Sequence, residues 1–315
     1  MKKKLSLLKR HARTKWLRHK WGRYYRHMAE LDPRFKLVYT GSDKGVFWKG
    51  NKLNEATPIN LLKQQQTNRA AFIVASGPSL REMDIQAISN HTSFGVNGSI
   101  LKFEEQGISP DFYVISDQSF VREHPDIITK IVEAGPHAFF TPAVLNEICL
   151  IEPGWLKAIQ FSVFENHFKP HNQKILTYRE IVELASTDQE IVTHTGKVGF
   201  SLNPEKGVFT AHTIVYFALQ LAYGLGFSTI GILGMDLGSN GSALRFYQSN
   251  HRKAPSHVVR DYDTAILPSF MVVRQLIQQG VLDVYNLSPN SRLPDSVIPK
   301  LTLPELMNLL SSSPD

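Results

Sequence analysis

Residues 71–99 read AFIVASGPSLREMDIQAISNHTSFGVNGS, and this stretch decides the fold. A short apolar run at 71–75 precedes a Ser-Gly-Pro-Ser turn and a helical pattern. The same order then repeats, with an apolar run at 93–96 and an Asn-Gly-Ser turn. Short apolar runs that alternate with helical periodicity are typical of β-α units, which build a mainly parallel sheet. We therefore predict an α/β protein with a Rossmann-like, mainly parallel sheet and helices on both faces.

The alternation continues to the end of the chain, interrupted by polar stretches at 28–68, 165–204 and 238–263. We expect the first to be an irregular connector or subdomain and the second a flap or subdomain. The third is longer than a connection in a compact domain needs, so we expect it to be a lid loop over an active site. We divide the chain into a basic arm with its connector, 1–68, and one α/β domain, 69–315. Further strands are expected at 112–115, 138–141, 159–164, 229–233 and 281–287, and helices at 81–88, 100–106, 211–223, 266–278 and 302–310.

The excess positive charge lies in one N-terminal segment. Residues 1–27 hold eleven Lys and Arg and no acidic residue, whereas the rest of the chain has 24 basic and 28 acidic residues. Trp16, Trp21, Tyr24 and Tyr25 are interleaved with these cations. A basic amphipathic helix of this kind lies among lipid headgroups, where each Lys or Arg contributes roughly 1 kcal/mol near anionic lipid. We expect the arm to bind an anionic membrane surface. The alternatives are a solvated or packed tail and, less favoured, a nucleic-acid arm.

The composition also indicates a compartment. Cys149 is the only cysteine, so it has no partner for an internal disulfide, as is usual in a reducing compartment. No apolar run approaches the roughly 20 residues of a membrane-spanning helix, and the basic start is not followed by the apolar segment of a signal peptide. We expect a cytoplasmic protein that lies on a membrane through its arm.

The polar residues that directly follow the expected strands are the first candidates for a site. Ligands of open parallel sheets bind outside the carboxyl ends of the strands, where such residues come together. The candidates are Ser76, Gly77, Pro78, Ser79, Asn97, Ser99, Ser116, Asp117, Asp236, Asn286 and Ser288.

The turn Ser76-Gly77-Pro78-Ser79 has neither the G-x-G-x-x-G spacing of a dinucleotide site nor the lysine of a P-loop. At the start of a helix its backbone N–H groups suit a phosphate or carboxylate, with Gly77 allowing close approach and Ser79 supplying a hydroxyl. A tight turn with a serine cap is the alternative. Asn97 donates and accepts at once, as recognition of a pyrimidine base or a sugar hydroxyl requires, or it forms an Asx turn.

Three residues are candidates for a general base. Asp117 and Asp236 each follow a strand and can orient a sugar hydroxyl or accept its proton, unless they are helix caps. His212 stands with Thr213 at the start of the clearest helix, where the helix dipole favours a neutral imidazole that can accept a proton. A capping or packed histidine is the alternative there.

Cations gather in the expected lid loop. Arg245 and Tyr247 lie close together, and Arg252, Lys253 and Arg260 follow. Guanidinium and phenol groups can neutralise a leaving phosphate without a metal. A solvated loop is the alternative reading of this segment.

One pair of carboxylates, Asp261 and Asp263, has a spacing that can hold Mg²⁺ or Mn²⁺ against a diphosphate. The pair follows Arg260 and precedes a helix instead of closing a strand, so acidic residues leading into that helix are the favoured reading. No His or Cys spacing resembles a metal site. We therefore expect no metal ligands and no cofactor.

The motifs, taken in order over roughly residues 71–303, resemble the WaaZ (RfaZ) family of lipopolysaccharide core proteins, which transfer 3-deoxy-D-manno-octulosonic acid (Kdo). No single motif is specific, whereas the ordered set is. The matching pieces are Ser76-Gly77-Pro78, Val96-Asn97-Gly98-Ser99, Asp117, Val198-Gly199-Phe200, His212-Thr213-Ile214, Arg245-Phe246-Tyr247, Arg260-Asp261, Asn286-Leu287-Ser288-Pro289 and Val297-Ile298-Pro299.

A more remote resemblance links the chain to bacterial sialyltransferases that use CMP-sialic acid, and to a Gly-Pro-Ser family that includes pterin diphosphokinases. It rests on Gly77-Pro78-Ser79-Leu80, Asn97 and Gly234-Met235-Asp236. CMP-sialic acid and CMP-Kdo are both CMP esters of 2-keto acids, so one site design can serve both. The sialyltransferase histidine follows the long loop, where this chain has only His251 and His257, at positions that are not histidine in the WaaZ pattern.

These resemblances imply that the Gly77 turn and Asn97 bind the CMP part of the donor, while Arg245 and Tyr247 receive its phosphate. Since the sialyltransferase base has no counterpart, the choice among His212, Asp117 and Asp236 stays open.

The resemblance implies transfer of Kdo from CMP-Kdo to a Kdo residue of the lipopolysaccharide inner core, on a Kdo-bearing lipid A acceptor. The protein would then lie on the inner face of the cytoplasmic membrane of a Gram-negative bacterium and would bind no nucleic acid. Three alternatives remain: transfer from another CMP-sugar, a pterin diphosphokinase-like reaction, and a non-catalytic assembly protein at the membrane.

Overall fold

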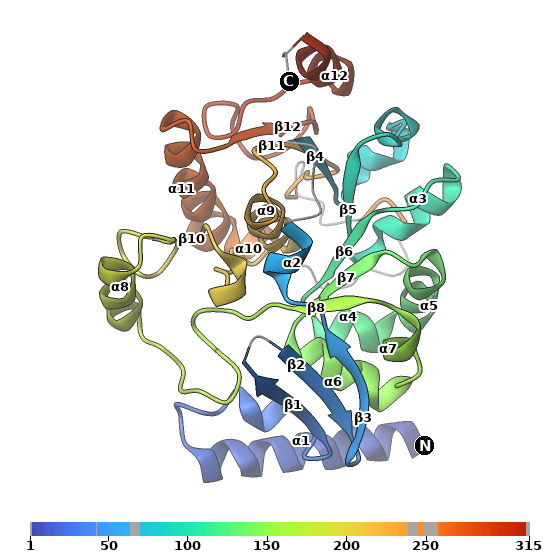
Figure 1. Cartoon of the computed structure of the whole chain (residues 1–315), viewed down its shortest axis with the longest axis vertical. Helices are drawn as coiled ribbons and strands as arrows, with labels where there is room; N and C mark the ends of the chain where they lie inside the picture. The colour runs from blue at the N-terminus through green and yellow to red at the C-terminus, as the bar shows by residue number, and fades with distance from the viewer. Residues whose placement is uncertain (1, 42, 64–69, 239–244, 248–257, 313–315) are drawn as a thin grey trace.

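A seven-stranded sheet forms the centre of the molecule in the computed structural model, with every neighbouring pair parallel (Figure 1). The structure describes residues 2–41, 43–63, 70–238, 245–247 and 258–312, the first nine of them by backbone only. The strands, in spatial order, are β12 (Asp283–Asn286), β11 (Thr229–Leu233), β4 (Ala70–Val74), β5 (Thr92–Val96), β6 (Phe112–Ile115), β7 (His137–Phe140) and β8 (Phe161–Val163).

Helices cover both faces of this sheet, and each face has its own apolar core. In β4, Ala71 and Ile73 point into one core, and Phe72 and Val74 into the other, because successive side chains of a strand point to opposite faces. The predicted fold class is thereby confirmed. The first core is covered by α9 (Ile214–Gly224) and α11 (Leu267–Gln278); the second by α3 (Ile100–Glu105), α4 (Gln118–Glu123), α5 (Pro125–Ala134), α6 (Pro142–Ile151), α7 (Trp155–Ala158) and α12 (Leu303–Ser312).

The strand order reverses beside β4. The chain adds β5, β6, β7 and β8 in turn on one side of β4, and then returns to place β11 and β12 on the other side. The connection after β4 packs on one face of the sheet and the connection after β11 on the other. Such a switch point is where open α/β sheets bind ligands.

The segment after β4 does not form the helix expected at 81–88. Two short 3-10 turns take its place, η2 (Pro78–Glu82) and η3 (Gln86–Ile88). Side chains form hydrogen bonds to the backbone of this segment. Gln106 Oε1 accepts from the N–H of Ile85 at 2.7 Å, and Asp84 Oδ1 accepts from the N–H of Gln86 at 2.9 Å. Local side-chain bonds of this kind compete with helix formation.

Part of the connector expected to be irregular is an antiparallel sheet of β1 (Phe35–Thr40), β2 (Asp43–Trp48) and β3 (Asn51–Ala56), followed by α2 (Ile59–Lys63). The expectation of an irregular backbone was therefore wrong for this part, whereas the alternative of a subdomain stays a prediction. Lys49 and Gly50 both have positive φ, 52° and 87°, as a tight two-residue hairpin requires.

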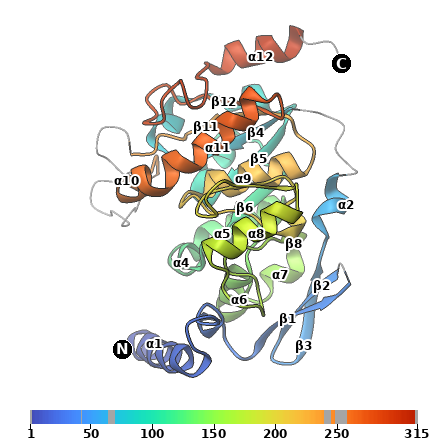
Figure 2. The same cartoon turned by 90° about the vertical axis from the view of Figure 1, so that its left-hand side faces the viewer.

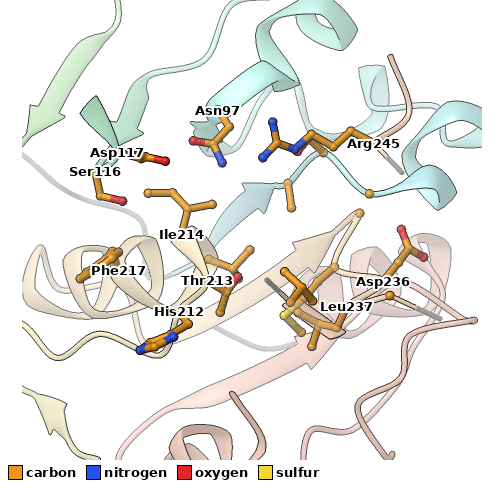
Figure 3. Close-up of a pocket in the computed structure, with 18 of the residues that line it drawn as sticks. Asn97, Ser116, Asp117, His212, Thr213, Ile214, Phe217, Asp236, Leu237 and Arg245 are labelled. Carbon is orange, nitrogen blue, oxygen red and sulfur yellow. The ribbon is translucent and has the colours of Figure 1, made fainter. Parts of the chain in front are cut away.

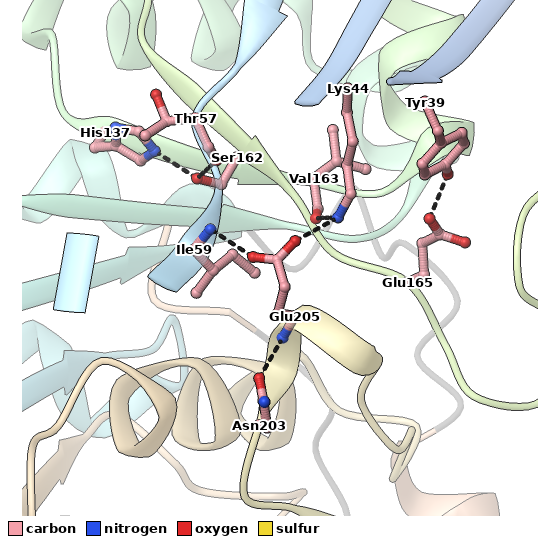
Figure 4. A network of polar contacts seen from close by, with 10 residues as sticks. All are labelled: Tyr39, Lys44, Thr57, Ile59, His137, Ser162, Val163, Glu165, Asn203 and Glu205. Carbon is pink, nitrogen blue, oxygen red and sulfur yellow. Dashed lines mark hydrogen bonds and ion pairs between the residues drawn. The ribbon is translucent and has the colours of Figure 1, made fainter. Parts of the chain in front are cut away.

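A polar network joins this small sheet to the edge of the main one (Figure 4). The Lys44 ammonium donates to the carbonyl oxygen of Val163 in β8 at 3.1 Å and to Glu205 Oε1 at 3.0 Å. Glu205 Oε2 accepts from the N–H of Ile59 at 2.7 Å. Because Lys44 is buried, this charge is stabilised by its partners, and the network fixes β2 against β8.

The stretch expected to be a flap or subdomain, 165–204, contains α8 (Tyr178–Thr187), β9 (Ile191–Val192) and β10 (Phe200–Ser201), followed by η5 (Pro204–Lys206). It projects at the left of Figure 1. Ile181 and Phe200 bury their side chains in the same core as α9. Most of the expected lid loop, 239–244 and 248–257, lies outside the described residues.

The basic arm forms α1 (Lys2–Trp21), which runs along the lower end of the molecule in Figure 1, and a 3-10 turn, η1 (Met28–Glu30). Figure 2 shows the same helix at the end away from α12. Arg13 fixes it to the body by donating to the carbonyl oxygen of Leu31 at 2.7 Å. Within the part of the chain that is described, no helix is long and apolar enough to cross a membrane.

Candidate functional site

A polar cavity of about 380 Å³ lies at the switch point (Figure 3), and we call it the switch-point cavity. It collects residues from the carboxyl ends of four strands, from the start of α9 and from the expected lid. Its wall is formed by Ala75, Ser76, Gly77, Pro78, Asn97, Ser116, Asp117, Thr210, His212, Thr213, Ile214, Val215, Phe217, Gly234, Met235, Asp236, Leu237, Gly238, Arg245 and Val258.

The Ser76-Gly77-Pro78-Ser79 turn is held against the loop after β11. The Gly77 N–H donates to the carbonyl oxygen of Gly234 at 2.9 Å. A Cβ on Gly77 would lie 2.1 Å from Asp236 Oδ2. The space beside Gly77 is thus occupied by Asp236 of the protein itself. This corrects the prediction that a phosphate approaches the chain at Gly77.

Asp236 is committed to the same turn. Its Oδ2 accepts from the backbone N–H of Ser79 at 3.0 Å and from the Ser79 hydroxyl at 2.9 Å, and the residue is buried. The anion that this turn binds is therefore the Asp236 carboxylate. These contacts contradict a ligand role for the Ser79 hydroxyl and make Asp236 a poor base, because its oxygen is already hydrogen-bonded. In Figure 3 the Asp236 carboxylate lies at the right of the view, apart from the Asn97 amide.

The turn after β5 presents Asn97 to the cavity and hides Ser99. Asn97 adopts a left-handed conformation, φ 49°, and its carbonyl oxygen accepts from the buried Tyr113 hydroxyl at 2.7 Å. Ser99 is fully buried, and its hydroxyl accepts from the N–H of Val96 at 2.9 Å. Ser99 therefore shapes the turn and does not reach a ligand, contrary to the prediction. The amide of Asn97 is the group that faces the cavity.

The start of α9 opens into the cavity. Thr213 is its N-cap, with an extended backbone and no capping bond from its own side chain. The residue before it, His212, has φ 57°, so the chain turns sharply as it enters the helix. An N-terminus of an eleven-residue helix carries free N–H groups and a partial positive charge, which suit an anion.

The described part of the expected lid, 245–247, is fixed by its middle residue. The Phe246 N–H donates to the carbonyl oxygen of Ser76 at 3.0 Å, and Arg81 donates to the Phe246 carbonyl oxygen at 2.7 Å. This directs Arg245 into the cavity, with its guanidinium toward Asn97 (Figure 3).

Tyr247 lies behind Arg245, whose Nη1 donates to the Tyr247 hydroxyl at 3.1 Å. The phenol ring packs on Gly98, where an added Cβ would lie 2.2 Å from the ring. Burial raises the pKa of Tyr247, and Arg245 opposes that shift. The phenol therefore stays protonated at neutral pH and can donate a hydrogen bond.

His212 belongs to a charge-assisted cluster that the sequence analysis did not find. Its Nδ1 lies 2.7 Å from Asp261 Oδ2, and Arg260 donates to Asp261 Oδ1 at 2.6 Å. These bonds, that of Arg260 first and that of His212 second, hold the pKa of Asp261 far below its usual range. The Asp261 carboxylate orients the imidazole and leaves Nε2 for another partner. Pairing of Nδ1 with a carboxylate is the arrangement that positions a histidine base.

This cluster changes the roles expected of Arg260 and Asp261. Arg260 pairs with Asp261 and is absent from the described wall of the cavity. Its position therefore does not support direct contact with a ligand. Asp263 pairs separately with Arg292 at 3.2 Å. The two carboxylates of the Asp-x-Asp motif thus face different cations. Among the described residues, no group of three or more His, Cys, Asp or Glu has the arrangement of a metal site.

Asp117 caps α4, its Oδ1 accepting from the Ser119 N–H at 2.7 Å, yet it is exposed at the cavity wall. Two other candidates at strand ends are structural, because Asn286 and Ser288 are fully buried. Arg252 and Lys253 lie outside the described residues, as His251 and His257 do.

A polar cavity at the switch point of a doubly covered parallel sheet defines a ligand-binding α/β protein of the Rossmann-like class. The chain belongs to the family described as "3-deoxy-D-manno-octulosonic acid transferase WaaZ", whose profile matches residues 54–304. This membership confirms the resemblance seen in the motifs, and with it the prediction of a glycosyltransferase that transfers Kdo.

Two relatives are both described as "Probable 3-deoxy-manno-octulosonic acid transferase". The protein of Escherichia coli K12 is 25% identical over 267 residues, which cover 79% of this chain and 88% of the relative. That of Salmonella typhimurium LT2 is 25% identical over 275 residues, covering 81% and 95%.

Solved structures with a similar backbone arrangement have lower sequence identity to this chain. The MAf glycosyltransferase of Magnetospirillum magneticum AMB-1 is 15% identical with a TM-score of 0.43; the match covers 78% of this chain and 37% of that structure, so the chain spans just over a third of its length. The sialyltransferase CstII of Campylobacter jejuni is 17% identical with a TM-score of 0.41, covering 74% and 85%.

Proposed function

We propose that this Kdo transferase uses CMP-Kdo as donor and a Kdo residue of the lipopolysaccharide inner core as acceptor. The observation that carries the donor is the position of Arg245, which faces the N-terminus of α9 across the switch-point cavity. A guanidinium and a helix N-terminus that converge on one space suit the phosphate of a sugar nucleotide. The Arg245 guanidinium points toward Asn97 (Figure 3), so Asn97 would then lie beside the cytidine or the sugar hydroxyls of the donor.

In the proposed reaction, the bond between the anomeric carbon of Kdo and the phosphate oxygen breaks, and CMP leaves with the electron pair. Arg245 and the Tyr247 hydroxyl stabilise the charge on the departing phosphate. The acceptor hydroxyl oxygen forms the new bond to the anomeric carbon, and its proton passes to Nε2 of His212, which Asp261 holds in orientation. These groups support a reaction without a metal.

The arm is proposed to hold the enzyme on the anionic inner leaflet of the cytoplasmic membrane of a Gram-negative bacterium, where a lipid-linked acceptor lies. Trp16, Trp21, Tyr24 and Tyr25 are exposed, and the Lys20 ammonium lies 5.2 Å from the centre of the Trp16 ring. Trp16 and Trp21 lie on α1, and Tyr24 and Tyr25 lie in the turn after it. Exposed aromatic and basic side chains in one segment are the pattern of an interfacial anchor.

The experiment that tests the donor and acceptor mixes purified protein with fresh CMP-Kdo and Kdo-bearing lipid A, and measures CMP release with Mg²⁺ and with EDTA. Acceptor-dependent release in both conditions is the expected result. Release only with Mg²⁺ would refute metal independence and return attention to Asp261 and Asp263. CMP binding without release would favour another CMP-sugar, and absence of both would favour a non-catalytic protein. ATP-dependent release of AMP with a pterin would support the diphosphokinase alternative.

A further inference from the structure

A second cavity of about 490 Å³ adjoins the first, and we call it the arm cavity. The two share three wall residues, Ser116, Asp117 and Phe217. Since Ser116 and Asp117 follow β6, the arm cavity continues the same carboxyl edge of the sheet outward, toward β7 and β8. A molecule bound in one cavity is therefore next to a molecule bound in the other.

The wall of the arm cavity comes from two sources. The loops after β7 and β8 supply Thr141, Glu165 and Lys169, and the basic arm supplies Arg18 and Arg26. The arm is thus part of a concave site as well as an exposed surface helix.

Hydrogen bonds fix the arm in this position. The His27 ring, through Nε2, lies 2.9 Å from the carbonyl oxygen of Pro170, and the Ile175 N–H donates to the carbonyl oxygen of Tyr24 at 2.7 Å. Gln118 of α4 donates to Glu30 at 3.1 Å. These bonds tie the end of the arm to the segment after β8 and to the helix after β6, so the wall is preformed.

The wall of the arm cavity holds three cations, Arg18, Arg26 and Lys169, and three acids, Glu30, Asp117 and Glu165. Glu30 pairs with Arg18, and Glu165 accepts from the Tyr39 hydroxyl and the His171 N–H. The other two cations can therefore bind an anionic ligand. Arg26, in the arm, and Lys169, in the loop after β8, are exposed cations at the wall.

Among the described residues, Nδ1 of His27 and Oε1 of Gln118 are buried without a hydrogen-bond partner. Such atoms cost free energy unless a ligand or water satisfies them.

We propose that the arm cavity binds the acceptor, and that it takes a sugar acid whose carboxylate lies between Arg26 and Lys169. This inference rests on the proposed function of the switch-point cavity as the donor site. Asp117, at the junction of the two cavities, accepts a hydrogen bond from a neighbouring hydroxyl of the acceptor sugar, and so orients the reacting hydroxyl, whose proton passes to His212. The arm then has two roles, with its exposed aromatic side chains facing lipid and its basic end holding the acceptor sugar.

The test measures transfer to a soluble, delipidated oligosaccharide that ends in Kdo, so that membrane binding does not enter. We compare the parent with Arg26→Ala, Lys169→Ala and the conservative Arg26→Lys. Loss of one charge-assisted contact is expected to raise KM for the oligosaccharide about tenfold, with KM for CMP-Kdo within about twofold of the parent. Arg26→Lys should recover part of the loss. Arg179→Ala, which removes an 89% exposed cation of α8 outside the cavity, is the matched control.

An unchanged KM for the oligosaccharide in Arg26→Ala and Lys169→Ala, while the parent transfers normally, would overturn the acceptor site alone. An equal rise for Arg179→Ala would also overturn it, because the effect would then be one of net charge. Absence of CMP release and transfer in the parent would instead refute the proposed donor. A carboxyl-reduced oligosaccharide should bind the parent about as weakly as the natural one binds Arg26→Ala; equal binding of both sugars would refute recognition of the carboxylate.

Discussion

Arg245 lines the switch-point cavity and Tyr247 lies behind it, on either side of Phe246, whose backbone is hydrogen-bonded to Ser76 and Arg81. Their positions depend on the protein and not on a ligand, so we expect a preorganised contribution to the leaving phosphate. Arg245→Ala is expected to lower kcat about a hundredfold and Tyr247→Phe about tenfold, with smaller effects on CMP affinity. Turnover assays and CMP titration measure the two effects. Unchanged turnover would remove both residues from the site.

His212 is expected to be the base. His212→Ala should lower kcat at least about a hundredfold, since general bases contribute roughly 10²- to 10⁴-fold. Asp261→Asn should have a smaller effect, because it removes the orienting carboxylate and leaves the imidazole. Asp236→Asn serves as the comparison for a buried acid of the same cavity. If Asp117→Asn abolished turnover while His212→Ala did not, Asp117 would be the base.

A buried histidine far from the chemistry predicts how stability depends on pH. Burial lowers the pKa of His167 to about 4, with Asp188 opposing the shift. Because the unfolded chain then takes up the proton first, the contribution of His167 to stability is full above about pH 6.5. It falls by up to roughly 1.4 kcal/mol per pH unit below that and levels off near pH 4.

Urea denaturation between pH 7.5 and 4.5 measures this effect. The free energy of unfolding should decline less steeply for His167→Gln than for the parent. His194→Gln, at an exposed position, is the control. Parallel curves for the parent and His167→Gln would contradict the prediction.

At the scale of elements, Gly98 connects the turn after β5 to the lid segment 245–247. The Tyr247 ring lies where a Cβ of residue 98 would be. Gly98→Ala should therefore displace this segment and lower kcat about tenfold, while the melting temperature changes little because the segment lies at the surface of the cavity. Gly154→Ala, where only the flexible Glu152 carboxylate lies within 3 Å, is the control. A variant with parental kcat would contradict the packing argument.

The elements differ in how well they could be predicted. All seven strands of the main sheet were predicted, because strands buried on both faces appear as continuous apolar runs. The small sheet was missed, since its strands are half exposed and polar, although Lys49 and Gly50 mark its hairpin. The helix after β4 was predicted where side chains of Asp84 and Gln106 bind the backbone instead. The Asp84 bond joins residues 2 apart and the Gln106 bond residues 21 apart, and neither leaves a periodicity in a sequence.

The position of the candidate site could be predicted from the sequence, but the roles of its individual residues could be predicted less well. The rule that ligands bind at strand ends located the cavity, and Asn97, Asp117, His212 and Arg245 all line it. Ser99 bonds to Val96, three residues before it, whereas the uses of Ser79 and Asp236 depend on a contact between residues 157 apart. Asp261 as partner of His212 was not foreseen for the same reason.

At the scale of the whole molecule, the arm is expected to govern membrane binding. Deletion of 1–27 should abolish binding to anionic liposomes, but it also removes part of the arm cavity. A sharper change replaces exposed groups only, in the triple variant Trp16→Ser, Lys20→Glu and Arg23→Glu. Sedimentation with anionic vesicles should show at least a tenfold loss of binding.

The matched control for this variant places the same charge change on the body, as Lys52→Glu and Lys157→Glu, both exposed. Both proteins should keep the parental KM for CMP-Kdo. Retained vesicle binding by the arm variant, or equal loss in the control, would contradict a specific role of the arm.

The division of the chain near residue 68 stays a prediction. The core beneath β8 also holds Phe35 and Trp48 of the small sheet, so the two parts share a core.

The strand order has a consequence for how this family can diversify. The proposed donor site, the switch-point cavity, lies around β4 and β11 at the middle of the sheet, whereas the arm cavity is lined by the loops after β7 and β8 and by residues 18–31. Substitutions in those outer segments can alter which sugar is extended without disturbing the nucleotide pocket. Libraries that vary only the rim after β7 and β8 and the end of the arm are therefore the direct route to transferases with new acceptor range and an unchanged donor.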